Sequence, residues 1–557
     1  MSGDRQMKKN DITEVYIEDF TKTGEGIGHI DGYTLFVKDA LIGDRVRAVI
    51  TRPKKHYAYA KALEITEPSP DRTGALCPCA RQCGGCNFQE YSYEAQLRWK
   101  RRYVEQTLRK IGGFENLEVR DVLGMEKPFR YRNKAQYPVA EIRTKSGETE
   151  IAAGFYAGHT HYLVPVRDCL LTDRGDEEIL DIILEHMRRF HVKPYDETDG
   201  SGLVRHILIR RGKRSGQILV CIIINGRNVP GMASLAEKLG QIEGMTSVSL
   251  NVNRKPGNVI MGDEIIPVLG DPWISDQLGD LIFRISPKSF YQVNPEQTEV
   301  LYGEACRAAG LTGRETVFDL YCGIGTISLR LAREAAEVYG VEIVPQAIQD
   351  AKQNARLNRI GNAHFYAGAA EELVVRGYFE EGVPLKKPDV VVVDPPRKGC
   401  DGKLLDTILK LEPRRIVYVS CDPATLARDL RILSGGGYRP EYVLPVDMFP
   451  QTSHVETVCV LSKLSEAKHH ISVQVDMDEL DLTSAEAKAT YKEIQDWVQE
   501  KYGFHVTNLN IAQVKQKHGI IERENYNKPK TPDSKQPGCP EDKIKAIEDA
   551  MRNFQMI

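Results

Sequence analysis

The chain has no long apolar run and almost no excess of charge of one sign. Its longest strictly apolar stretch, residues 218–224, has seven residues, whereas a membrane-spanning helix needs about 20. A transmembrane helix is therefore excluded, and the polar first residues lack an apolar leader, so we expect a cytoplasmic protein without membrane contact. The net charge of −3 arises from 75 basic and 78 acidic residues, and this balance neither favours nor excludes a nucleic-acid partner.

Twelve cysteines in 557 residues do not make a disulfide framework, because the cytosol keeps thiols reduced. Four of them fall within ten residues, Cys77, Cys79, Cys83 and Cys86, and Cys169 follows much later. The second Cys-x-x-Cys pair of a zinc ribbon is missing, and so is the three-then-two spacing of radical enzymes. Three clustered thiols with a remote fourth suit an iron–sulfur cluster or zinc, and Cys79 leaves the ligand count open.

Patterning divides the chain into four parts. Short strands with Gly-rich turns predict a small OB-like β-barrel over residues 1–68, with strands at 15–20, 33–37, 45–50 and 57–65. The Pro68–Ser69–Pro70 stretch reads as a linker. We expect an α+β domain at 69–285, including a basic amphipathic helix at 91–111, and a helical extension of unknown role at 465–557. The extension would hold helices at 484–502 and 510–517, a Pro-rich tract at 525–540 and a final helix.

Strands and helices alternate in the remaining part, residues 286–464. A buried strand at 316–320 leads through a Gly-rich turn into a helix at 327–335, and a further helix is expected at 345–357. Further strands are expected at 338–341, 390–393, 415–419 and 455–461. This alternation predicts an α/β fold with a doubly wound parallel sheet, in which ligands bind at the carboxyl ends of the strands.

Three runs mix cations with aromatic or imidazole side chains, a combination that suits single-stranded RNA because phosphates need charge and splayed bases need stacking surfaces. The first run covers residues 45–61 and includes Tyr57 and Tyr59, the second covers 98–102 around Trp99, and the third covers 205–214. A single run of this kind is most often a solvated face, but three of them indicate an RNA partner.

The Gly-rich turn favours one class of ligand. Gly323 and Gly325 fit a dinucleotide fingerprint, but Ser328 stands at the third glycine position. Glu342 lies 19 residues after Gly323 at a strand end, where a carboxylate can bind a ribose hydroxyl pair. Without a pyrophosphate to approach, the turn favours S-adenosylmethionine over NAD.

Three later strand ends carry reactive groups. In Asp394–Pro395–Pro396–Arg397 no aromatic residue follows the prolines, which argues against methylation of an exocyclic amine. Cys421 precedes a helix that starts at Pro423, and the helix dipole would stabilise a thiolate there. Glu456 enters the same crevice and could act as a general base. Taken singly, Cys421 is about as often a buried structural cysteine, and a carboxylate such as Glu456 is more often a structural partner.

The chain resembles the bacterial RNA uracil-5-methyltransferases of the 23S ribosomal RNA branch, over about residues 10–463. Six motifs carry the resemblance: 290–294 (FYQVN), 319–325 (DLYCGIG), 341–342 (VE), 394–397 (DPPR), 420–423 (SCDP) and 454–457 (HVET). The resemblance implies a Rossmann-like methyltransferase domain, an N-terminal TRAM barrel, and a monomeric enzyme acting on 23S ribosomal RNA.

The resemblance also implies roles for single residues. Cys421 matches the nucleophile and Glu456 the base, while Phe290 and Asn294 lie in a motif near the methyl donor. Four residues match the positions that bind S-adenosylmethionine: Gln292, Tyr321, Glu342 and Asp394. Four cysteines match the ligands of a 4Fe-4S cluster: Cys77, Cys83, Cys86 and Cys169.

Two other interpretations stay open. One is a different methyl target, either a uridine of transfer RNA or a cytosine; transfer-RNA relatives typically lack the barrel and the cysteine cluster, which favours ribosomal RNA. The other is a non-enzymatic RNA-binding or iron–sulfur sensing protein. The presence of both Cys421 and Glu456 in their motifs favours the enzyme.

Overall fold

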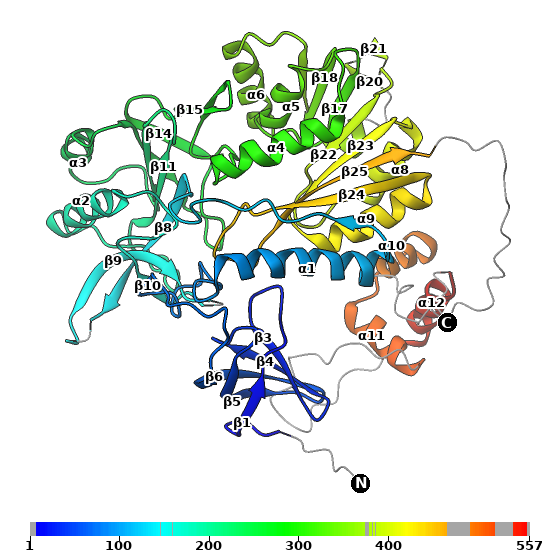
Figure 1. Cartoon of the computed structure of the whole chain (residues 1–557), viewed down its shortest axis with the longest axis horizontal. Coiled ribbons are helices and arrows are strands. Elements are labelled where there is room, and N and C mark those ends of the chain that lie inside the picture. Colours follow the sequence, from blue (N-terminus) through cyan, green and yellow to red (C-terminus); the bar gives the residue numbers. More distant parts are fainter. Residues whose placement is uncertain are drawn as a thin grey trace. The chain divides into compact units, whose positions relative to one another are not determined.

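A computed structural model describes residues 7–144, 146–158, 160–373, 378–380, 383–384, 386–464, 491–518 and 539–553. The chain forms two compact units, Met1–Ser465 and Glu466–Ile557, and each is described by itself (Figure 1). None of the described helices is both long and apolar enough to cross a membrane.

The N-terminal strands form one six-stranded sheet in the order β1-β5-β6-β4-β3-β2. β1 also contacts β3, so the sheet curls around a core that includes Val15, Leu35 and Ile50. The predicted strand at 15–20 is split in two, and the predicted turn at 24–28 is partly a strand. The bounds are β1 Ile12–Tyr16, β2 Asp19–Phe20, β3 Gly26–Ile30, β4 Tyr33–Lys38, β5 Arg45–Pro53 and β6 Tyr57–Glu67.

The stretch after the barrel is not a free linker. Ser69 is buried, and its amide donates to the carboxylate of Asp44, which also pairs with Arg72. Phe20 and Leu41 of the barrel pack with Phe88 and other aromatic residues of the following segment. The barrel is therefore fastened to the rest of the first unit by apolar and charged contacts.

Helix α1 (Tyr93–Gly112) is a long helix capped at both ends. Ser92 Oγ accepts from the Ala95 amide at 3.4 Å, and Gly113 ends the helix with φ +74°, a conformation that suits glycine. α1 packs on α9, and β7 (Glu118–Val119) extends the C-terminal sheet beside β24. The sequence places residues 91–111 with the central part, and in the structure the apolar face of α1, including Val104 and Leu108, joins the core of the C-terminal sheet.

The central part is a seven-stranded sheet in the order β10-β9-β8-β11-β12-β13-β14. All seven residues of β12 are buried, because α2 and α3 cover one face of the sheet while the β15–β16 hairpin and α4 lie against the other. The bounds are β8 Lys134–Arg143, β9 Thr149–Tyr156, β10 Leu163–Pro165, α2 Asp176–Arg189, β11 Val204–Arg211, β12 Ile218–Ile224, α3 Met232–Gly240, β13 Met245–Val252, β14 Glu264–Leu269, β15 Ile274–Leu278 and β16 Leu281–Ile285.

The C-terminal sheet has eight strands in the order β19-β18-β17-β22-β23-β25-β24-β7, which confirms the doubly wound α/β fold class. The sheet is not parallel throughout, because β25 runs antiparallel to β23 and to β24. The bounds are α4 Pro295–Ala309, β17 Thr316–Asp319, α5 Thr326–Leu331, β18 Glu337–Glu342, α6 Pro345–Leu357, β19 Ala363–Ala367, α7 Ala370–Leu373, β20 Tyr378–Glu380, β21 Val383–Pro384, β22 Val390–Val393, α8 Gly402–Leu411, β23 Arg415–Ser420, α9 Pro423–Gly435, β24 Tyr438–Val446 and β25 Glu456–Lys463.

The second unit contains three described helices, α10 Tyr491–Tyr502, α11 Asn508–Lys517 and α12 Glu541–Asn553. They share a core that includes Ile494, Val498 and Ile547. Of the helix predicted at 484–502, residues 484–490 lie outside the described part of the chain, and so do residues 525–538 of the predicted Pro-rich tract.

Candidate active site

A cavity of about 680 Å³ opens at the carboxyl ends of β17, β18, β22 and β23. Six predicted site residues line it together: Gln292, Tyr321, Glu342, Asp394, Cys421 and Glu456. They come from four strand ends, the start of β25 and the loop before α4. Because the ends of parallel strands meet at one edge of the sheet, residues up to 164 positions apart converge on this cavity.

The Gly-rich turn, which the sequence predicts to bind the methyl donor, lines one side of the cavity. We call this side the donor half. Gly325 has φ +86°, and a Cβ there would meet the Phe365 ring at 3.2 Å, so only glycine fits. Ser328, which replaces the third glycine of a dinucleotide fingerprint, donates its hydroxyl to buried Asp319 at 2.5 Å. Desolvation raises the pKa of Asp319 to about 6, although this hydrogen bond acts to lower it.

The loop that carries Gln292 is braced by the central sheet. The Asn133 amide donates to Val293 O at 2.8 Å, and Asn133 Nδ2 donates to Gln292 O at 3.0 Å. Phe290 is 71% exposed at the rim. Asn294 does not line the cavity; it is buried beneath it, where its side chain caps α4 and donates to Met448 O at 3.0 Å.

The reactive half of the cavity combines one thiol with two carboxyl groups. Burial, then Glu456, then Asp394 raise the pKa of Cys421 to about 12, and Arg397 acts to lower it. Desolvation and Asp319 raise the pKa of Asp394 to about 7. Burial and Asp394 raise the pKa of Glu456 well above its usual value.

These shifts bear on the expectation that the dipole of the following helix stabilises a thiolate at Cys421. Cys421 does precede the N-cap residue of α9, Asp422, as predicted, but the helix dipole does not give it a low pKa in the free protein. A helix N-terminus contributes at most about 2 kcal/mol, and burial beside two carboxyl groups outweighs it. The surroundings of Cys421 therefore favour the protonated thiol.

Phe449 and His454 line the same cavity, and the sequence prediction did not assign them a role. Burial, then the cations Arg397, Lys100 and Arg132, lower the pKa of His454 to about 4, so its imidazole is neutral at pH 7. The sequence could have indicated His454 as a cavity residue, because it lies two residues before Glu456. Phe449 had no such indication, because it sits in an irregular loop.

The predicted cluster cysteines surround a second, smaller cavity of about 60 Å³. Cys77, Cys83, Cys86 and Cys169 line it, whereas Cys79 does not and points its sulfur toward Pro165 O at 3.8 Å. Arg132 also lines it, and its buried Nε has no hydrogen-bond acceptor among the described residues. Within that same part of the chain, no three His, Cys, Asp or Glu side chains lie close enough to hold a single metal ion.

Two of the three predicted RNA-binding runs are partly buried. In the second run Trp99 is buried and Lys100 pairs with Asp447 in the interior. In the third run Arg205, His206 and Arg210 are buried. These buried residues cannot contact RNA in this structure, whereas Arg98, Arg101 and Arg102 of the second run are exposed and pair with aspartates. The first run remains: the rings of Phe36, Tyr57 and Tyr59 contact one another on the barrel at centroid distances of 5.6–5.8 Å, and both tyrosines are exposed.

Family comparisons agree with this arrangement. The family described as tRNA (Uracil-5-)-methyltransferase matches residues 270–464, and the TRAM domain matches residues 6–63. A protein of Halalkalibacterium halodurans described as an uncharacterized RNA methyltransferase is 48% identical over 456 residues, covering 82% of this chain and 98% of its own. A protein of Clostridium acetobutylicum with the same description is 45% identical over 463 residues, covering 83% and 99%.

One solved structure adds the ligand class. The tRNA (uracil-54, C5)-methyltransferase of Pyrococcus abyssi, in complex with S-adenosyl-L-homocysteine, is 26% identical with a TM-score of 0.64, and the match covers 81% of this chain and 100% of that one. The chain thus belongs to the RNA uracil-5-methyltransferase family, with a TRAM domain at its N-terminus, and is an S-adenosylmethionine-dependent enzyme that methylates uracil in RNA at carbon 5.

Proposed function

We propose that the enzyme works through a covalent bond between Cys421 and carbon 6 of the target uracil. Carbon 5 of uracil is a poor nucleophile, and addition of a thiolate at carbon 6 converts the ring into an enolate. Carbon 5 then attacks the methyl group, the S–CH3 bond of the donor breaks, and S-adenosylhomocysteine is left. The observation that carries this proposal is that Cys421 shares one cavity with all four predicted donor-binding residues.

Glu456 is the base that releases the product. Its carboxylate takes the proton from carbon 5, the C5=C6 double bond re-forms, and the sulfur of Cys421 leaves as a thiolate. Its place at the start of β25, with an exposed fraction of 5%, supports this role because a desolvated carboxylate is a stronger base. Asp394 raises its pKa further, and Arg397 opposes that shift.

The methyl donor controls when the thiol becomes reactive. Cys421 faces Glu456 and Asp394, so its thiolate is disfavoured in the free enzyme. The sulfonium of S-adenosylmethionine brings a positive charge into the same cavity, which offsets the two carboxylates. Reaction at carbon 6 then depends on a bound donor.

Gln292, Tyr321, Glu342 and Asp394 bind the donor. Glu342 ends β18, where a carboxylate meets a ribose hydroxyl pair, and Tyr321 follows β17 beside the Gly-rich turn. Gln292 stands in the loop braced by Asn133. These assignments account for the polar groups that surround the donor half of the cavity.

We also propose that Cys77, Cys83, Cys86 and Cys169 hold a 4Fe-4S cluster. Cys79 does not line their common cavity, and Arg132, whose buried Nε has no acceptor among the described residues, does line it. Thiolates and inorganic sulfides would accept that hydrogen bond. The donor set suits a polynuclear group better than a single ion. When bound, the cluster would fasten the cysteine loop to the segment around Cys169.

The RNA partner is 23S ribosomal RNA, bound by a monomer in the cytoplasm. The reaction requires the target base to leave its stack so that carbon 6 becomes accessible. The barrel offers exposed tyrosines beside Lys54 and Lys61, which suit splayed bases and phosphates. The resemblance to the 23S branch supports this choice of RNA.

Transfer RNA is the second candidate. The archaeal transfer-RNA enzyme matches 81% of this chain, far more than the methyltransferase domain, so a barrel-containing architecture does not by itself indicate ribosomal RNA. Mapping of methyluridines by mass spectrometry in both RNAs from a deletion strain distinguishes the two. We expect one 23S methyluridine to vanish and to return with the wild-type gene but not with Cys421→Ala. Loss from transfer RNA alone would contradict the 23S assignment.

A further inference from the structure

An irregular loop, residues 447–455, leads into Glu456 of the reactive half of the cavity. It joins β24 to β25, it supplies Phe449 and His454 to the cavity wall, and Glu456 follows it directly. Within the loop, Thr452 donates to Phe449 O and the His454 amide donates to Thr452 Oγ1. The rest of the loop is held by residues from other parts of the chain.

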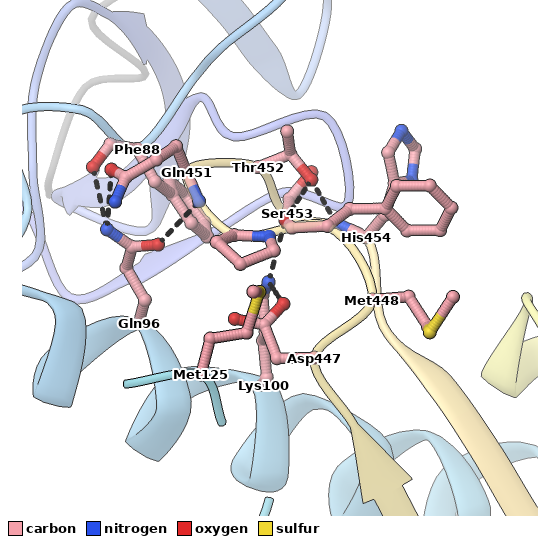
Figure 2. Close-up of polar contacts among 12 residues, drawn as sticks. Phe88, Gln96, Lys100, Met125, Asp447, Met448, Gln451, Thr452, Ser453 and His454 are labelled. Carbon is pink, nitrogen blue, oxygen red and sulfur yellow. Dashed lines mark hydrogen bonds and ion pairs between the residues drawn. The ribbon is translucent and has the colours of Figure 1, made fainter. Parts of the chain in front are cut away.

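Asn294 and Gln297 of the methyltransferase domain donate hydrogen bonds to Met448 O and Asp447 O, and many further contacts come from outside that domain. Lys100 on α1 pairs with Asp447 in the interior and donates to Phe449 O at 3.2 Å. Tyr131 OH donates to Pro450 O at 3.1 Å. The amides of Asn87 and Phe88 donate to Gln451 O at 3.2 and 3.1 Å. Figure 2 shows Gln96 and Lys100 pointing from α1 toward this loop.

The loop backbone has an unfavourable conformation at Gln451. The φ of this residue is +68°, a left-handed conformation that disfavours residues with a Cβ, and its side chain is 3% exposed. Gln96 makes two hydrogen bonds to Gln451. Gln96 Oε1 accepts from the backbone amide of Gln451 at 3.0 Å, and Gln96 Nε2 donates to the side-chain Oε1 of Gln451 at 3.1 Å. Gln96 is itself fully buried and reaches the carbonyls of Phe88 and Tyr91 as well.

The next turn of the loop is tied to the barrel. Asn87 Oδ1 accepts from the Ser453 amide at 2.9 Å, and Asn87 Nδ2 lies 3.0 Å from Ser453 Oγ and 2.8 Å from Thr23 O. Ser453 Oγ in turn donates to Lys22 O at 2.8 Å. His454 comes next in the chain, so the last fixed point of the loop lies directly beside a cavity residue.

We infer that Gln96 is a positioning residue for the methylation reaction, acting through the strained backbone of Gln451 to hold Phe449, His454 and Glu456 in place. Two reciprocal hydrogen bonds fix one backbone conformation that the loop would not adopt on its own. Positioning errors of about 1 Å cost about 100-fold in rate, so a buried amide far from the substrate can control turnover. The inference rests on the proposed roles of Cys421 and Glu456 in the same cavity.

Gln96→Leu tests this, because leucine fills the space and removes both hydrogen bonds. We expect the single-turnover rate at saturating donor and RNA to fall about ten- to 100-fold, with the affinity for S-adenosylmethionine changed by less than about twofold. Gln451→Gly is the second variant. Glycine adopts φ +68° without strain, so the protein stays folded, but the hydrogen bond between the Gln96 and Gln451 side chains is lost. Its rate should fall in the same direction.

The matched control is Asn251→Leu. Asn251 is a fully buried amide on β13 that makes three hydrogen bonds, to Gly262 and Glu264, and it does not touch the loop. It should lose stability as Gln96→Leu does and keep its single-turnover rate. Wild-type rates in both Gln96→Leu and Gln451→Gly would overturn the inference, as would an equal loss of rate in the control. If instead Cys421→Ala retains turnover, the proposed mechanism fails rather than this positioning role.

Discussion

The two thiol-bearing cavities of this enzyme each contain an arginine but differ in the other groups beside their thiols. Burial raises the thiol pKa in both, to about 12 for Cys421 and for Cys86. Beside Cys421 stand the carboxyl groups of Glu456 and Asp394, which raise the pKa further. Beside Cys86 and Cys169 stands Arg132, which acts to lower it.

The difference separates a nucleophile from a ligand set. A thiol held against carboxylates stays protonated until a cation arrives, and the methyl donor is a cation. Burial raises the pKa of all four cluster thiols. The guanidinium of Arg132 opposes this for Cys86 and Cys169, which suits a set of ligands to a permanently bound group. The same residue type therefore serves two purposes because its charged neighbours differ.

The largest effect is expected from Cys421→Ala, which removes the nucleophile and leaves the donor half of the cavity intact. Methyl transfer should fall by at least about a thousandfold, as for other covalent catalysts. Calorimetry should find donor binding nearly unchanged. Turnover close to wild type would show that Cys421 belongs with the structural thiols.

Serine at the four cluster positions should abolish iron binding. Anaerobically purified wild-type protein should contain about four irons, the complement of a 4Fe-4S cluster, and Cys77→Ser, Cys83→Ser, Cys86→Ser and Cys169→Ser should each lose them. Cys79→Ser is the matched control, because Cys79 lies outside the cavity, and it should keep its iron. Zinc in place of iron, or dependence on Cys79 but not on Cys169, would refute this ligand set.

The barrel surface should matter for RNA and not for the donor. Tyr57→Ala combined with Tyr59→Ala removes two exposed rings, and each stacked base contributes about 1–3 kcal/mol, so RNA affinity should fall about tenfold or more. Donor affinity should not change, since both residues are remote from the 680 Å³ cavity. Equal RNA affinity in filter-binding titrations would mean that this face does not meet the substrate.

The smallest effect concerns pH. Asp394 and Asp319 have pKa values raised to about 7 and about 6, so they gain negative charge as the pH rises through this range. A cationic donor should therefore bind about three- to tenfold more tightly at pH 8 than at pH 5.5, by proton linkage. S-adenosylhomocysteine lacks the sulfonium charge and should respond less. Parallel pH profiles for the two ligands in calorimetry would contradict this.

The sequence was most informative where local chemistry determines structure. Strand ends at Asp319, Glu342 and Asp394 were predictable because buried apolar runs end at turns; Glu342 and Asp394 line one cavity, and Asp319 is buried and bonded to Ser328. Hydrophobic runs do not encode strand direction, which is why β25 was wrongly predicted to be parallel. Phe449 lines the cavity because of the path of an irregular loop, and no pattern in the neighbouring sequence predicts that path.

The main error of the sequence analysis was to treat buried charged residues as exposed, and this error has a physical cause. Lys100 lies in a basic stretch that looks like a solvated helix face, but its partner Asp447 is 347 residues away. Breaking such a buried pair costs about 3–5 kcal/mol, so it is part of the core. A pattern read over neighbouring residues cannot reveal a partner at that distance.

The most direct test of the covalent mechanism is the fate of RNA on Glu456→Gln. Without a base the proton on carbon 5 remains, elimination cannot proceed, and the methylated intermediate stays attached to the enzyme. Incubation with donor and RNA followed by denaturing gels and peptide mass spectrometry should show a stable adduct on the peptide containing Cys421, and none in Glu456→Gln combined with Cys421→Ala. An adduct on another residue, or a variant with neither adduct nor rate defect, would contradict the mechanism.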